Sequence, residues 1–208
     1  MKNLIRLLCI LLLITGCSSN NDNEKTNNVS NNEQIIEETE ENFDEAVKLI
    51  EENNDSTELF DDTMVVGEDG KGYVEVPSNW VKFTDASGSG SFQYSSPNMS
   101  HIITLDKIVW SEEVPGENQT AEAVANNYYR YFESTGITKI QGAMVNYDNI
   151  DKDVYEIYGY YDNEQSIWIV DVLTDENGDV YFVSIEGLFN EDILNIYNLI
   201  VKTYNFTK

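Results

Sequence analysis

Two apolar segments, IWIVDVLT at residues 167–174 and VYFVSIE at residues 180–186, flank the turn Asp175-Glu176-Asn177-Gly178-Asp179. Asn-Gly between two alternating apolar segments is the strongest short-range signal of a β-hairpin, because both central positions of the tight turn take positive φ. We therefore expect two antiparallel strands here, joined by a tight turn. The segments on either side extend the same pattern.

Further strand-like segments lie upstream of this hairpin. They alternate apolar and polar residues and are separated by turn residues such as Glu68-Asp69-Gly70-Lys71 and Ser96-Pro97-Asn98. Residues 80–83 resume extended structure after Pro77-Ser78-Asn79, and residues 87–91 form a flexible loop. The other predicted strands are residues 63–66, 72–76, 92–95, 101–108, 137–147 and 154–161.

Two helices interrupt and end this series of strands. The first has Asn118 or Thr120 as its N-cap and Gly136 at its C-terminal stop. The second begins after Asn190, with Glu191 and Asp192 in its first turn. Their predicted core faces are Ala121, Val124, Ala125, Tyr128 and Phe132, and then Ile193, Ile196, Tyr197, Ile200 and Val201. Short connections between strands predict an α+β fold, an antiparallel β-sheet flanked by helices.

The opening and the end of this region resemble a known family. GYVEVPSNW at residues 72–80 and FQYSSP at residues 92–97 are similar to the start of the PsbP-like domain, and VYFVSIEG at residues 180–187 before a helix fits its end. The resemblance covers residues 63–208 and implies an α-β-α sandwich. It also implies an extracytoplasmic accessory protein without catalysis, and it carries over no functional residues.

The first 17 residues predict where the protein resides. Lys2 and Arg6 precede a short apolar run, as in a secretory signal peptide, and that run is shorter than the roughly 20 residues that span a bilayer. LITGC at residues 13–17 resembles a bacterial lipobox. The resemblance implies cleavage of the signal peptide, residues 1–16, and acylation of Cys17 by chains such as palmitate. Cys9 would leave with the signal.

Residues 17–62 form the second predicted unit, a lipidated cysteine followed by an acidic and mostly disordered tether. Within it, Phe43, Ala46, Val47 and Ile50 recur at helical spacing, which indicates one short amphipathic helix in residues 40–52. Like charges oppose this helix. Residues 63–208 would then be one folded domain of ordinary size.

The chain is strongly acidic, with a net charge of −26. Phosphate binding needs clustered lysine and arginine, so nucleic acid is a poor partner. An anionic membrane surface would repel the chain as well, which leaves the lipid as the attachment to the membrane. This charge favours cations, cationic peptides or a protein with a basic face as partners. The alternative is that the charge only maintains solubility.

Candidate sites for chemistry are few. His101, the only histidine, lies beside Ser100 without a nucleophile motif, so we expect an incidental polar residue. The acidic segments 148–153 and 175–179 match no EF-hand and are interpreted as turns, with weak calcium binding as the alternative. Nothing selects two of the carboxylates for glycoside hydrolysis. We expect no cofactor, because there is no glycine-rich phosphate loop, and no metal.

Aromatic residues are the remaining signal. Most should lie in the core, and an exposed group could bind a peptide or a glycan. They include Trp80, Trp110, Trp168, Tyr128, Tyr129, Tyr131, Tyr155, Tyr158, Tyr160 and Tyr161.

The sequence therefore predicts a lipoprotein on the extracytoplasmic face of the cell membrane, a non-catalytic binding or accessory module with an envelope protein as its partner. A small-ligand or cation-binding lipoprotein is the alternative, and an envelope hydrolase is a weaker one. A deep apolar pocket would favour ligand binding, an exposed apolar patch a protein partner, and a buried carboxylate pair in a cleft the hydrolase.

Overall fold

A computed structural model describes residues 60–83, 90–161 and 165–208 of the chain. The predicted signal peptide, Cys17, the tether as far as residue 59 and the helix in residues 40–52 lie outside these residues, as does most of the predicted loop at residues 87–91.

The main sheet has seven strands, every neighbouring pair antiparallel, in the order β3-β4-β5-β9-β8-β7-β6. The predicted Asn-Gly hairpin is the β8–β9 pair, in which Thr174 is paired with Val180. The expected positive φ at both central positions is wrong: Gly178 has φ 89° and Asn177 does not have positive φ, because the strands are joined by five residues rather than by a two-residue turn. The strands are β3 Val81–Lys82, β4 Phe92–Ser95, β5 His101–Lys107, β6 Thr138–Tyr147, β7 Ile150–Tyr161, β8 Ser166–Thr174 and β9 Val180–Leu188.

A second, two-stranded sheet packs beside the first. Its strands β1 (Thr63–Glu68) and β2 (Gly72–Pro77) form the predicted hairpin around residues 69–71. Tyr73 of β2 exchanges two backbone hydrogen bonds with Asn205, with N–O distances of 2.7 and 2.9 Å. The end of the chain is thereby attached to the small sheet.

Both predicted helices form where their caps place them. Helix α2 spans Ala121–Thr135, after the short 3-10 turn η2 (Gly116–Asn118), and Thr120 Oγ1 accepts from Ala123 N at 3.1 Å. Gly136 ends α2 in the left-handed region at φ 79°. Helix α3 spans Glu191–Thr203, and Asn190 Oδ1 accepts from Ile193 N at 3.1 Å.

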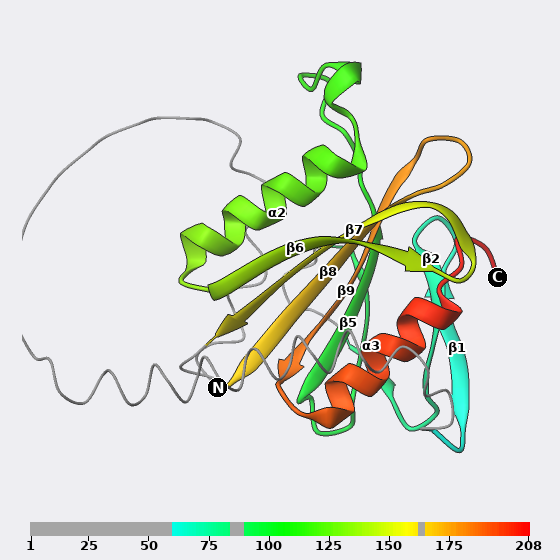
Figure 1. Ribbon diagram of the computed structural model, residues 1–208. Coiled ribbons are helices and arrows are strands. Elements are labelled where there is room, and N and C mark those ends of the chain that lie inside the picture. Colours follow the sequence, from blue (N-terminus) through cyan, green and yellow to red (C-terminus); the bar gives the residue numbers. More distant parts are fainter. Residues whose placement is uncertain (1–59, 84–89, 162–164) are drawn as a thin grey trace, which may run out of the picture.

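The helices cover opposite faces of the main sheet, so the fold has three layers (Figure 1). Helix α2 packs on β6, β7 and β8, and its five predicted core residues are all buried. Helix α3 packs with the small sheet against the other face, where four of its five predicted core residues are buried and Val201 is half-buried. The predicted α+β fold, an antiparallel sheet flanked by helices, is confirmed.

Most strand boundaries agree with the sequence prediction to within two residues, and two strands differ in a way that the pairing explains. Strand β7 begins at Ile150 rather than at Val154, because Tyr147 pairs with Ile150 and closes the hairpin over only Asp148 and Asn149. The strand predicted at residues 80–83 is reduced to two residues, since β3 pairs with β4 only through Val81 and Lys82.

Candidate functional site

The two acidic segments singled out in the sequence meet at one end of the main sheet. Together with the first turn of α2 they border an open cleft of about 610 Å³. The Lys152 Nζ donates to the backbone oxygen of Asp175, which links the two segments. The cleft is lined by Gln119, Thr120, Ala121, Glu122, Asp151, Lys152, Asp153, Tyr155, Thr174, Gly178 and Val180.

The carboxylates of the β8–β9 turn are engaged in holding the turn. Asp175 Oδ1 accepts from Asn177 N at 2.9 Å and from Asp179 N at 2.8 Å. Asp179 Oδ2 lies 2.5 Å from Lys107 Nζ, and this hydrogen bond is the main reason why the pKa of Lys107 is raised. Residues 175–179 therefore form a turn, as predicted. Across the described ranges no cluster of three or more His, Cys, Asp and Glu side chains could hold a metal ion.

The other acidic segment is more strand than loop. Only Asp148 and Asn149 form the turn, and residues 150–153 belong to β7. Asp151 and Asp153 are exposed at the rim of the cleft, and so is Glu122 on the first turn of α2. The cleft therefore presents carboxylates to solvent, whereas the nearby Lys152 ammonium is held by Asp175. Such a rim attracts cationic groups.

His101 is a buried structural residue. Its ring nitrogens lie 3.0 Å from Ser100 Oγ and 3.3 Å from the backbone oxygen of Leu188, so the imidazole joins the start of β5 to the end of β9. The Ser100 hydroxyl also donates to Asn98 Oδ1 at 2.8 Å, and in the described part of the chain the partners of the ring are this hydroxyl and a backbone oxygen. Gly187 permits this contact, because a Cβ there would lie 2.7 Å from the imidazole.

A pair of buried carboxyl groups lies under α3, and sequence reasoning did not select it. Glu156 of β7 and Asp171 of β8 are opposite one another in the register and are 4% and 0% exposed. The Tyr197 hydroxyl of α3 donates to Glu156 and lies 3.0 Å from Asp171 Oδ2, and Tyr147 donates to the same oxygen at 2.5 Å. We call these four residues the acid–tyrosine cluster.

The surroundings of Asp171 in the acid–tyrosine cluster favour its protonated form. Burial raises the pKa of Asp171 well above its usual range, and the charge of Glu156 raises it further, while the two tyrosine hydrogen bonds act in the opposite direction. Neither carboxyl lines the cleft. The pair therefore lacks the substrate access that a glycosidase needs. A signal was present in the sequence, since Asp171 occupies a core-facing position within an apolar strand.

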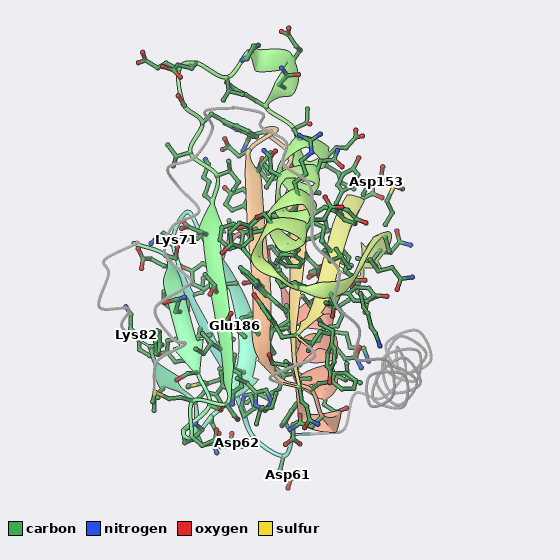
Figure 2. The ribbon with its side chains drawn as sticks, turned by 90° about the vertical axis from the view of Figure 1, so that its left-hand side faces the viewer. Asp61, Asp62, Lys71, Lys82, Asp153 and Glu186 are labelled. Atoms are coloured by element: carbon green, nitrogen blue, oxygen red, sulfur yellow. The ribbon has the colours of Figure 1, made fainter. Side chains whose placement is uncertain are left out.

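The opposite face of the sheet carries a second polar group beside α2. Glu186 of β9 is half-buried, and burial raises its pKa to about 7. Its cross-strand neighbours are Ile102 of β5 and Trp168 of β8. Figure 2 shows Glu186 on the sheet below α2, apart from Asp153 at the cleft. The structure therefore does not bring the acidic rim and Glu186 into one site.

The aromatic residues are mostly core, as predicted. Trp80 and Trp168 are each 5% exposed, and Trp168 packs against Tyr128, Tyr131 and Phe132 of α2. Tyr129 is the exception, 37% exposed on the outer side of α2. Within the described part of the chain, the exposed large apolar residues are otherwise aliphatic, among them Met144 and Val109.

Comparisons with known proteins reveal no family. No family model matches the chain, and no curated protein does. Among solved structures, the chain is similar to the Ran-binding protein Mog1p of Saccharomyces cerevisiae, with 10% identity and a TM-score of 0.48 over 71% of this chain and 96% of that one. A mutant of Mog1 matches with the same identity and TM-score over 71% of this chain and 97% of that one. Likeness at this level carries no functional argument.

Proposed function

We propose that the chain is a lipoprotein anchored to the extracytoplasmic face of the cell membrane through Cys17, whose domain is a non-catalytic binding module. The lipobox-like residues 13–17 support the anchor. Several acyl chains would hold the protein far better than one, since each buried CH₂ contributes about 0.8 kcal/mol. No helix among the described residues has the length and apolar character needed to cross a bilayer.

The binding end of the proposed module is the acidic cleft. The observation that carries this assignment is its rim, where Glu122, Asp151 and Asp153 are exposed while the Lys152 ammonium donates to the backbone oxygen of Asp175. The three carboxylates outnumber the one ammonium, and a net negative charge at a hollow surface concentrates ligands of opposite charge. The partner is therefore a basic segment of another envelope protein. The PsbP-like assignment of residues 63–208 remains part of this proposal and rests on the quoted motifs.

Metabolic labelling with palmitate tests the anchor. We expect label on the wild-type protein and on Cys9→Ala, since Cys9 leaves with the signal peptide, and none on Cys17→Ala. Equal labelling of the Cys17→Ala variant would refute the anchor, and recovery of unmodified wild-type protein from the cytosol would do the same.

Binding of fluorescent decalysine tests the cleft. The variant Glu122→Gln/Asp151→Asn/Asp153→Asn is compared with Asp61→Asn/Glu133→Gln/Asp192→Asn, which removes three exposed carboxylates elsewhere. We expect the affinity to fall about tenfold or more in the first variant and by less than about threefold in the second, because local charge dominates at physiological salt, where the screening length is about 8 Å. Equal losses would show that net charge alone attracts the peptide.

A further inference from the structure

The two edges of the main sheet are protected to very different degrees. The edge strand β3 has two residues, and one of them is Lys82. The edge strand β6 has ten residues, TKIQGAMVNY, and its only charged residue is Lys139 near the start. Natural proteins usually shorten, charge or bulge an edge strand, because its free backbone groups pair with other strands. Strand β6 has a bulge only at its two ends.

The middle of β6 is open to solvent. Residues 141–144 and Asn146 are all exposed, and the Met144 side chain is 64% exposed. In a chain in which 24% of the residues are charged, residues 140–146 carry no charge at all. Solubility alone would favour a lysine or a glutamate on this edge. The absence of charge in residues 140–146 therefore suits an edge that pairs with another strand.

Gly142 provides an independent observation. The other strand glycines are required by the fold: a Cβ at Gly67, Gly72, Gly159 or Gly187 would lie within 2.6 Å of another residue. At Gly142 a Cβ would meet only the backbone oxygen of Glu156 at an ordinary 3.7 Å, and φ is not in the left-handed region. Glycine weakens a strand interior, and it often marks the close approach of a second backbone or a ligand. The fold itself therefore does not explain this glycine.

We propose that β6 pairs with β6 of a second copy of this chain, antiparallel across a two-fold axis at Ala143. In this register Met144 lies opposite Gly142 of the second copy, and both are on the α2 face, since they pair with Tyr155 and Ile157 of β7. The exposed methionine fills the space that the glycine leaves, twice per dimer. The two seven-stranded sheets become one continuous sheet.

Charge decides between a second copy and a cationic peptide as the occupant of β6. The paired segments, residues 140–146, are uncharged, so two copies oppose no like charges within the pair. A cationic peptide would find no acidic residue on the edge itself. Each copy nevertheless has a net charge of −26, so the domains repel one another at long range. Salt screens that repulsion and therefore strengthens the dimer, whereas it would weaken the binding of a cationic peptide.

Cysteine crosslinking tests the register. The chain beginning at Ser18 keeps every described residue and contains no cysteine, since the only two are Cys9 and Cys17. Under mild oxidation, Ala143→Cys should form disulfide dimers, because directly opposed Cβ atoms lie about 4.5–5.5 Å apart. The control, Asn146→Cys, places the two thiols six positions out of register, roughly 20 Å apart, and should crosslink at least tenfold less.

Sedimentation velocity of the same cysteine-free chain tests the pairing without crosslinks. We expect a dimer whose fraction rises between 50 mM and 500 mM salt, and at least a tenfold weaker association in Met144→Lys and in Gly142→Val. Both positions are exposed, so circular dichroism should show the fold of each variant unchanged. A monomer at every salt and protein concentration, equal crosslinking of the two cysteine variants, or unaffected association in Met144→Lys would each overturn the proposal.

Discussion

The two faces of the main sheet bury acidic side chains in different ways. On the α3 face, Glu156 and Asp171 share hydrogen bonds from tyrosines of α3 and β6. On the α2 face, Glu186 is half-buried, and within the described residues burial alone raises its pKa. Buried polar groups cost little when their hydrogen bonds are satisfied and much more when they are not. The α3 face holds its acids in a tyrosine network, which leaves Asp171 Oδ1 without a partner among the described residues, whereas the α2 face leaves Glu186 partly in water.

The largest expected effect on the free energy of unfolding comes from truncating an apolar side chain between α2 and the sheet. Phe132 is 0% exposed, and its ring centroid lies 4.9 Å from that of Trp168. Phe132→Ala should lower the free energy of unfolding by about 3–5 kcal/mol, because it leaves a cavity between α2 and the sheet. Urea denaturation measures the change. Tyr129→Ala, on the exposed side of the same helix, should stay within about 0.5 kcal/mol. A similar loss in both variants would show that α2 does not depend on this face.

The acid–tyrosine cluster should make the free energy of unfolding depend on pH. The pKa of Asp171 is raised in the folded state, so its stabilising contribution is complete below the unfolded pKa and is lost as pH rises through the folded pKa. Asp171→Asn keeps the shape without the charge. We expect it to be more stable than wild type by about 2 kcal/mol at pH 8 and nearly equal at pH 4. Urea denaturation at both pH values measures the difference, and a variant that loses stability at pH 8 would contradict a retained proton.

The elements that local patterns determine were predictable from the sequence. Asn177-Gly178 located the β8–β9 hairpin, and the three- and four-residue spacing of Val124, Tyr128 and Phe132 identified the face of α2 that packs on the sheet. These signals work because turn geometry and helical periodicity depend on neighbours in the chain.

The arrangement of the sites was not predictable in the same way. The pairing of β5 with β9 joins strands far apart in the chain, and it alone brings Ile102 beside Glu186. The cleft likewise arises because β7 and β8 place Asp153 and Gly178 near the start of α2. The cluster was closer to prediction, since a hairpin register would have opposed Glu156 to Asp171. Its tyrosines come from β6 and α3, and no local pattern points to them.

The smallest effect belongs to Glu186, and it has the same sign as the effect of Asp171 because burial raises both pKa values. Burial raises its pKa to about 7 in the folded state from an ordinary value near 4.5. Between about pH 4.5 and 7 the Glu186 carboxyl is protonated in the folded state and ionised in the unfolded state. The free energy of unfolding therefore falls as pH rises from about 4.5 to 7 and then levels off. Partial exposure to solvent reduces the total loss to about 1–2 kcal/mol.

Replacing this carboxyl by an amide should remove that loss. Glu186→Gln should match wild type at pH 4 and exceed it by about 1–2 kcal/mol at pH 8, measured by urea denaturation at both pH values. Glu133→Gln, an exposed carboxyl on α2, provides the control and should change stability at neither pH. If Glu186→Gln instead proved less stable at pH 8, the carboxylate would have a hydrogen-bonding or cationic partner on the α2 face. The contrast between a networked pair of acids and an acid held only by partial burial would then fail.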